Sequence, residues 1–148
     1  MGGGPRVSVV IADDVAGLRR LLRIALEESR SFEVVGEAAD GVEAIMAAEQ
    51  LMPDLMLLDL SMPRMDGLEA LPRLRLVAPP MCLVVLSGLS EEHMGPKAVE
   101  LGADAFLEKG MAPHELVTRL LAVVDSPPSG PPPASGPELT RFAVRARG

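Results

Sequence analysis

The sequence predicts an α/β domain in which a parallel β-sheet is covered by helices on both faces. Five short runs rich in Val, Ile and Leu recur along residues 6–125, and a segment with the apolar spacing of a helix follows each of them. The connections between these segments are short. Alternation of this kind is typical of a parallel sheet, because each crossover helix packs back onto one of its faces.

The first two strand–helix pairs occupy the N-terminal third of the chain. Residues 6–12 are rich in β-branched side chains and predict a strand, and residues 32–37 predict a second strand that lies nearer an edge because they alternate only in part. The helix after the first strand is expected to bury Leu18, Leu21, Leu22 and Ala25. Asp40 is expected to cap the second helix, which runs to residue 50, with Glu43 completing a capping-box-like pair.

The same alternation continues through the rest of the domain. Strands are expected at residues 54–59, 81–86 and 105–107, and helices at residues 66–76, 91–101 and 113–124. Leu68, Leu71 and Leu74 form the apolar face of the first of these helices. Gly102 is expected to stop the helix before it, and Pro113 suits the first turn of the last helix.

The composition changes once, near Asp125. Residues 126–137 are all Pro, Ser or Gly apart from one Ala, and residues 138–148 carry three Arg and one Glu. We therefore expect a domain over residues 6–125, a flexible N-terminus over residues 1–5, and a disordered linker with a short basic tail over residues 126–148. Residues 138–148 carry a net charge of +2. Because the net charge of the whole chain is -7, residues 1–125 carry -9.

Charge and composition exclude several functions. A chain with net charge -7 and three Phe as its only aromatic residues suits neither direct DNA binding by phosphate neutralisation nor stacking on bases. One cysteine, Cys82, forms no intramolecular disulfide and no Cys-based zinc site, and it is expected to be a buried small hydrophobe. No apolar run is long enough to span a membrane, and the N-terminus lacks the apolar core of a signal peptide, so we expect a cytoplasmic protein.

Polar side chains gather where the predicted strands end. Asp13 and Asp14 follow the first strand, Asp59 ends the third, Ser87 follows the fourth, and Lys109 lies just past the fifth. The carboxyl ends of parallel strands meet at one edge of the sheet, where ligands bind in open α/β folds. We therefore expect three carboxylates, a hydroxyl and an ammonium group to lie close together there.

This set of groups suits phosphoryl chemistry assisted by a hard divalent cation. Three neighbouring carboxylates repel one another, and Mg²⁺ (or Mn²⁺) relieves the repulsion through oxygen ligands. A carboxylate beside such an ion can act as a nucleophile towards phosphorus, as aspartyl-phosphate enzymes show. Lys109 would neutralise charge on the phosphoryl oxygens, and Ser87 could donate a hydrogen bond to one of them.

The motifs resemble those of the receiver domain of two-component response regulators, the CheY-like family. The matching residues are the Asp13–Asp14 pair, Asp59 within LLDLSMPRMDG, Ser87–Gly88, and Lys109 within GADAFLEKG. The resemblance covers residues 6 to about 124 and implies a flavodoxin-like (βα)5 fold with sheet order 2-1-3-4-5. VVIADD and FLEKG are most similar to receivers of LuxR/NarL-type regulators, whose output domain we do not expect here.

The resemblance also implies roles for the acidic residues and the lysine. Asp59 would accept a phosphoryl group from the phosphohistidine of a sensor histidine kinase or phosphotransfer protein. Asp14, Asp59 and the backbone carbonyl of Ser61 would bind Mg²⁺ directly, and Asp13 would act through water. Lys109 would hold the phosphoryl group. Catalysis would be limited to self-catalysed phosphotransfer and autodephosphorylation, so the chain is not expected to be an enzyme acting on other molecules.

A switch is implied as well. Ser87 would move towards the phosphoryl group and vacate space for the ring of Phe106, changing the face formed by the fourth helix, fifth strand and fifth helix. That face would bind a downstream protein, or a second copy of the chain as a homodimer. Gly88 keeps access to the phosphoryl group open. Leu89 flanks the path of the attacking water and, being apolar, cannot orient it, which predicts slow self-hydrolysis.

Three functions therefore stay open from the sequence. The first is a stand-alone phosphoacceptor that signals by binding another protein. The second is a receiver-fold scaffold that acts unphosphorylated. The third is an Asp-nucleophile phosphatase, which is disfavoured because that class places its two Asp residues two positions apart after the first strand, whereas Asp13 and Asp14 are adjacent.

Overall fold

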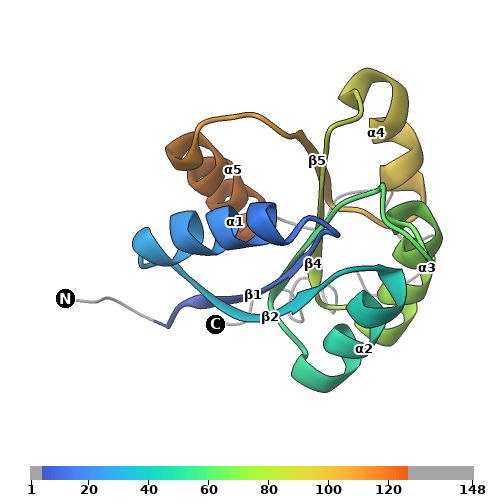
Figure 1. Cartoon of the computed structure of the whole chain (residues 1–148), viewed down its shortest axis with the longest axis horizontal. Helices are drawn as coiled ribbons and strands as arrows, with labels where there is room; N and C mark the ends of the chain where they lie inside the picture. Colours follow the sequence, from blue (N-terminus) through green and yellow to red (C-terminus); the bar gives the residue numbers. More distant parts are fainter. Residues whose placement is uncertain (1–4, 127–148) are drawn as a thin grey trace.

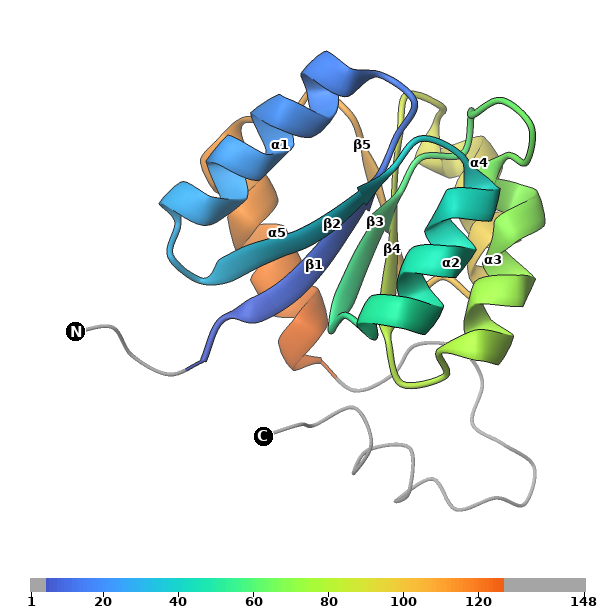
Figure 2. The same cartoon turned by 60° about the horizontal axis from the view of Figure 1, so that its bottom comes forward.

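The structure is a five-stranded parallel sheet between two layers of helices (Figures 1 and 2), and the strand order is β2-β1-β3-β4-β5. This computed structural model describes residues 5–126, so the expectations for residues 1–4 and 127–148 lie outside the described residues. The strands are β1 (Val7–Ala12), β2 (Phe32–Ala38), β3 (Leu55–Leu58), β4 (Cys82–Ser87) and β5 (Ala105–Glu108). The helices are α1 (Ala16–Glu28), α2 (Gly41–Leu51), α3 (Gly67–Val77), α4 (Glu91–Glu100) and α5 (Pro113–Asp125).

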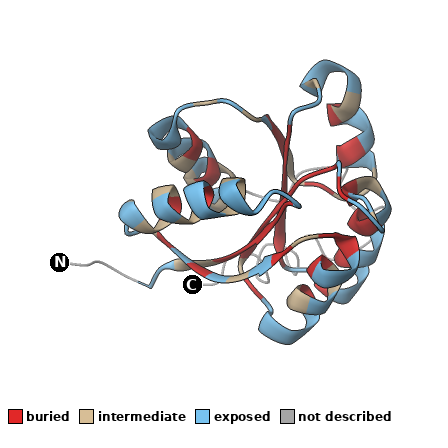
Figure 3. Ribbon diagram, viewed as in Figure 1, coloured by how far each residue is buried: buried red, intermediate tan, exposed pale blue. Residues whose placement is uncertain are grey.

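The predicted fold class is confirmed, including the edge position of the second strand. Helices α1 and α5 cover one face of the sheet, and α2, α3 and α4 cover the other (Figure 2). Each layer has its own apolar core, and the central strands β3 and β4 are buried, whereas the edge strand β2 alternates between buried and exposed residues (Figure 3). The strands β3 and β4 have no exposed residue, which explains why they are continuous apolar runs in the sequence.

Side chains and glycine set the helix ends as the sequence predicts. The Asp40 carboxylate accepts a hydrogen bond of 2.8 Å from the backbone N–H of Glu43, and the Glu43 carboxylate accepts one from the backbone N–H of Ala39. Asp66, which was expected as the first residue of a helix, instead caps α3 in the same way. Gly102 follows α4 with a φ of 125°, a conformation that strains any other residue. These local signals therefore position the loops between strands and helices.

The prediction of which side chains the first helix buries is partly wrong. Leu21 is 65% exposed, whereas Leu22 and Leu26 are buried. The apolar stripe is centred one position away from the prediction, because α1 packs against the sheet on one side and against α5 on the other. Periodicity alone does not distinguish two neighbouring apolar positions when only one of them faces the sheet.

None of the helices within residues 5–126 combines the length and the apolar composition that a membrane span needs.

Candidate functional site

Three carboxylates meet at the carboxyl edge of the sheet, as the sequence predicts. Asp13 and Asp14 follow β1, and Asp59 follows β3, the neighbouring strand. One oxygen atom from each of the three carboxylates lies within 4.8 Å of the others. Asp13 and Asp59 are buried, while Asp14 is exposed. Oxygen donors alone, at this spacing, form a site whose chemistry suits a hard divalent cation.

Backbone hydrogen bonds between strand ends place these carboxylates. The N–H of Asp59 donates to the carbonyl of Ala12, at 2.9 Å, and the N–H of Asp13 donates to the carbonyl of Ala38, at the same distance. The sheet ladder thus continues one residue past β1 and β3. The Asp13 carboxylate is oriented further because it accepts a hydrogen bond of 2.9 Å from the backbone N–H of Val15.

The ammonium group of Lys109 bridges two of the carboxylates, those of Asp13 and Asp59. Its Nζ lies 2.9 Å from Oδ2 of Asp13 and 3.4 Å from Oδ2 of Asp59. Burial lowers the pKa of Lys109, but hydrogen bonds and charge attraction from the two carboxylates outweigh this, so the pKa lies above its ordinary value. Lys109 therefore stays charged at neutral pH.

The pKa of the buried Asp59 carboxyl lies above its ordinary value. Burial, followed by repulsion from Asp13, raises the pKa of Asp59, and this outweighs the lowering by Lys109 and by a hydrogen bond from the Ser61 backbone N–H. An ionised Asp59 is therefore held at a free-energy cost in the folded chain. A positive charge bound beside the Asp59 carboxylate, or a reaction that neutralises this carboxylate, removes that free-energy cost.

Ser87 lies on the same edge, at the last position of β4. Its hydroxyl is buried and accepts a hydrogen bond of 3.0 Å from the backbone N–H of Leu89. Its carbonyl accepts a hydrogen bond of 2.8 Å from the backbone N–H of Lys109. Ser87 therefore contacts both the β4–α4 loop and the lysine. Gly88 and Leu89 are exposed in this loop, as are Asp14 and Ser61 beside it in the site.

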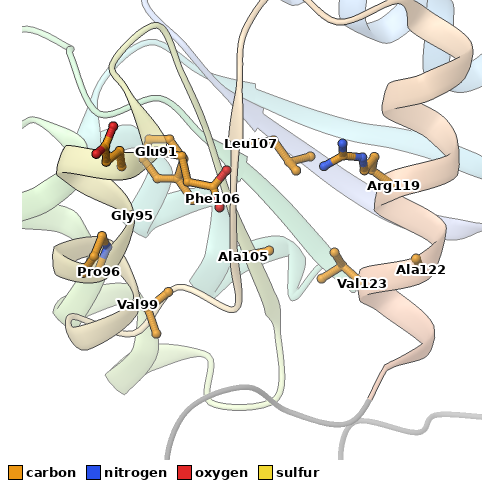
Figure 4. A pocket seen from close by; sticks show the side chains of 11 residues that line it. Glu91, Gly95, Pro96, Val99, Ala105, Phe106, Leu107, Arg119, Ala122 and Val123 are labelled. Carbon is orange, nitrogen blue, oxygen red and sulfur yellow. The ribbon is translucent and has the colours of Figure 1, made fainter.

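Phe106 lies below the site on the same face of the sheet as Ser87. It pairs with Val85 in the β4–β5 register, and Ser87 pairs with Glu108, so Ser87 and Phe106 are diagonal neighbours. The ring is 5% exposed and packs in the core beneath α4, against Gly95. Figure 4 shows it pointing towards α4, whereas Leu107 points towards α5. The described state thus has an inward ring.

Sequence reasoning missed the role of Gly67. A Cβ at this position would lie 2.3 Å from the carbonyl oxygen of Asp59 and 2.8 Å from Cα of Leu60. The N–H of Gly67 also donates a hydrogen bond of 2.9 Å to the carbonyl of Leu60. The start of α3 therefore packs directly on the backbone of Asp59. The sequence contained a signal, since Gly67 closes the MDG end of the motif around Asp59.

The loop after Asp59 is also tied to α2. Nε of Arg64 donates a hydrogen bond of 2.6 Å to the buried carboxylate of Asp40, the residue that caps α2. The backbone N–H of Gly41 donates to the carbonyl of Met65, at 2.8 Å. The hydrogen bond from the Glu43 N–H, ahead of that from Arg64, lowers the pKa of Asp40 and keeps it ionised. No short motif in the sequence indicates this long-range contact.

A second contact that the sequence did not indicate holds the loop after β1. One nitrogen of the Arg19 guanidinium donates a hydrogen bond of 2.5 Å to the backbone carbonyl of Asp13. Its Nε donates to the carboxylate of Glu37 on β2, at 2.7 Å. The hydrogen bond from Arg19 is the largest cause that lowers the pKa of Glu37. Arg19 thus joins β2 to the acidic pair.

Comparison with known proteins identifies the same part of the chain. The family model described as response regulator receiver domain matches residues 9–121. A transcriptional regulatory protein, YhcZ of Bacillus subtilis, is 43% identical over 112 residues, which are 75% of this chain and 52% of that protein. The chain therefore spans about half the length of this relative. Chemotaxis protein CheY of Thermotoga maritima is 32% identical over 112 residues, which are 76% of this chain and 92% of that protein.

A solved structure of a protein complex contains a chain with the same fold. The CheX–CheY–BeF3–Mg complex of Borrelia burgdorferi contains a chain that is 25% identical to this one, with a TM-score of 0.76. The alignment covers 81% of this chain and 90% of that chain. The strand order and the five helices described above are thus those of a fold already observed with a partner protein.

Proposed function

This chain belongs to the family of response regulator receiver domains, and on that premise we propose that it is a phosphoacceptor signalling protein. Asp59 accepts a phosphoryl group from the phosphohistidine of a sensor histidine kinase or a phosphotransfer protein in the cytoplasm. The observation that supports this most strongly is the juxtaposition of three carboxylates within 4.8 Å with the ammonium group of Lys109. This arrangement supports the proposal that a nucleophile, a cation site and a charge clamp lie in one place.

The reaction is a displacement at phosphorus. An ionised oxygen of Asp59 attacks the phosphorus atom, and the bond between phosphorus and the imidazole nitrogen breaks. The electron pair of that bond stays on the imidazole, which takes up one proton, and the product is an acyl phosphate on Asp59. Lys109, 3.4 Å from Oδ2 of Asp59, stabilises the negative charge on the phosphoryl oxygens.

The donor set fits Mg²⁺. We propose that Asp14, Asp59 and the backbone carbonyl of Ser61 hold the ion and that Asp13 acts through water. Asp13 suits the indirect role because its two carboxylate oxygens already bind the Val15 N–H and the Lys109 ammonium. When bound, Mg²⁺ neutralises charge among the carboxylates and on the phosphoryl group.

Binding of Mg²⁺ is expected to stabilise the fold. At a Mg²⁺ concentration about 100 times its Kd, the free energy of unfolding should rise by about 2.7 kcal/mol. Asp14→Asn removes a ligand and should abolish most of this rise, whereas Asp125→Asn, an exposed change at the end of α5, should preserve it. Thermal unfolding with and without Mg²⁺ measures the difference. A full Mg²⁺ response in Asp14→Asn would contradict the proposed ligand set.

The signal is proposed to leave through the face formed by α4, β5 and α5. Phosphorylation adds negative charge and three acceptor oxygens at Asp59, which attract the hydroxyl of Ser87. Ser87 then gives up its bond to the Leu89 N–H, and the β4–α4 loop moves with it. Space opens beside Phe106, the diagonal neighbour of Ser87. A two-state shift of this face is what a downstream protein partner would recognise.

The phosphoryl group on Asp59 is expected to be long-lived. Leu89 is 43% exposed beside the path of an attacking water and has no group that orients it. Leu89→Asn supplies an amide that orients the water, so loss of the phosphoryl group should be several times faster than in the wild type. The decay of the intact mass after removal of the phosphodonor measures both lifetimes. A wild-type half-life of seconds would show that Leu89 does not limit hydrolysis.

One experiment separates the proposed function from its two alternatives. The full chain is incubated with Mg²⁺ and acetyl phosphate, and its intact mass is measured over time. Addition of one phosphoryl group, lost in Asp59→Asn, supports the phosphoacceptor. Steady turnover of acetyl phosphate without accumulation supports an Asp-nucleophile phosphatase instead. No addition in a chain that binds Mg²⁺ and is folded supports a scaffold that acts unphosphorylated.

A further inference from the structure

An apolar groove lies between α4 and α5, over the edge strand β5 (Figure 4). Its volume is about 920 Å³. Most of its wall is apolar: Pro96 and Val99 come from α4, Ala105 from β5, and Ala122 and Val123 from α5. Within residues 5–126 no element covers it, since α4 and α5 flank the groove on either side.

The rim of the groove is acidic at the end nearest the start of α4. Glu91 and Glu92 line the groove and are both exposed. The carboxylate of Glu108 accepts a hydrogen bond of 2.8 Å from the backbone N–H of Glu91, so it lies at the same end. The cation that lines the groove, Arg119, lies 3.5 Å from the carboxylate of Glu115. The groove therefore has a surplus of negative charge beside its apolar wall.

A basic segment follows α5, one wall of this groove, along the same chain. Ser126, the last described residue, is three positions after Val123. Eleven residues, 127–137, connect it to the segment 138–148, and six of the eleven are Pro. A connection of this kind spans up to about 37 Å when extended. The segment therefore reaches any part of the groove without displacing a described element.

The segment 138–148 has the pattern of a short amphipathic helix. Four of its five apolar residues recur at helical spacing: Leu139, Phe142, Ala143 and Ala146. Val144 lies off this stripe. Arg145 and Arg147 would flank this stripe on its two sides, whereas Arg141 would lie opposite it. An apolar stripe flanked by positive charge is complementary to an apolar groove with an acidic rim.

We propose that segment 138–148 occupies the α4–α5 groove of its own chain as a short helix. Phe142 packs against Val99 and Val123, and the flanking arginines, Arg145 and Arg147, face the acidic rim formed by Glu91 and Glu92. A tether of this length gives an effective concentration in the millimolar range, so a contact with a Kd of about 1 mM is already populated. Occupancy does not require phosphorylation of Asp59. That the segment thereby shields the face from a downstream partner rests on the proposed function.

A single introduced Trp tests the contact, because the chain contains no Trp and no Tyr. Phe142→Trp places the reporter on the proposed contact face, and Val144→Trp places it two positions on, away from that face. Both are made in the full chain and measured without phosphodonor. Phe142→Trp should emit at shorter wavelength than Val144→Trp, and acrylamide should quench it about half as much.

A groove variant shows whether the difference depends on the groove. Ala122→Arg places a long side chain at an exposed groove position, with a positive charge that repels the arginines of the segment. In this background, the Phe142→Trp emission should match that of Val144→Trp. Gln50→Arg, the same change in charge on α2, should leave the difference intact. Circular dichroism and thermal unfolding verify that both variants are folded.

The outcomes are distinct. Equal exposure of the two Trp variants overturns the proposal, and so does a difference that Ala122→Arg leaves unchanged. A difference that grows with protein concentration shows docking onto a second copy and overturns occupancy within one chain. None of these results depends on the acetyl phosphate experiment, so the failure of either proposal is recognised separately.

Discussion

Asp59→Asn is expected to abolish the phosphoryl adduct and, at the same time, to stabilise the folded chain. The amide nitrogen and oxygen of Asn are poor nucleophiles, so no acyl phosphate forms at this position. The stabilisation has a different origin. Asp59 is buried beside Asp13, and burial and that repulsion raise its pKa. A neutral side chain of the same shape removes this unfavourable charge.

The free energy of unfolding of Asp59→Asn should exceed that of the wild type by about 1 kcal/mol at neutral pH, which corresponds to a rise of about 4 °C in Tm for a domain of this size. Its pH dependence has a definite sign. Because the pKa of Asp59 is raised in the folded state, the contribution of this residue to stability is full below its unfolded pKa and declines as pH rises through its folded pKa. The extra stability of Asp59→Asn over the wild type should therefore be largest near pH 7 and disappear at about pH 4.

Urea unfolding of both proteins over this pH range, in the presence of a chelator, measures the effect. Glu33→Gln is a matched control, since Glu33 is an exposed carboxylate on β2, and it should change stability little at either pH. An Asp59→Asn protein that is less stable than the wild type near pH 7 would show that the attraction of Lys109 outweighs burial and Asp13. A phosphoryl adduct that persists in Asp59→Asn would place the acceptor elsewhere.

Gly67→Ala is expected to lower the stability of the chain more than the addition of a methyl group anywhere else in the site. The added Cβ would lie 2.3 Å from the Asp59 carbonyl oxygen, which is a backbone atom and cannot rotate away. The start of α3 must shift, and its hydrogen bond to Leu60 is lost or lengthened. We expect a cost of about 3 kcal/mol. Asp59 should move with its carbonyl, so phosphorylation by acetyl phosphate should slow as well.

Gly17→Ala is the matched control for this prediction. Gly17 is near the start of α1, as Gly67 is at the start of α3, and a Cβ at Gly17 meets no atom within 4 Å. Ala should therefore stabilise the chain there, by about 0.5 kcal/mol, because it restricts the unfolded state. Chemical unfolding of the two variants gives the comparison. A Gly67→Ala protein as stable as the wild type would contradict the close packing of α3 on the Asp59 backbone.

Local sequence patterns were sufficient where a residue's surroundings are set by its neighbours in the chain. The cap at Asp40 and the stop at Gly102 depend on hydrogen bonds and backbone angles within a few positions. The buried face of α1 depends instead on two packing partners, the sheet and α5, and the prediction that Leu21 is buried was wrong for that reason.

The sequence by itself determined which residues meet at the site. Parallel strands end at one edge, so residues placed after β1, β3, β4 and β5 converge there whatever the details of packing. The tertiary structure decided how they differ. Only the packed fold buries Asp13 and Asp59 while leaving Asp14 exposed, and only it brings Gly67 onto the Asp59 carbonyl and Arg64 to Asp40. Such contacts depend on distances between segments far apart in the chain, which no local pattern encodes.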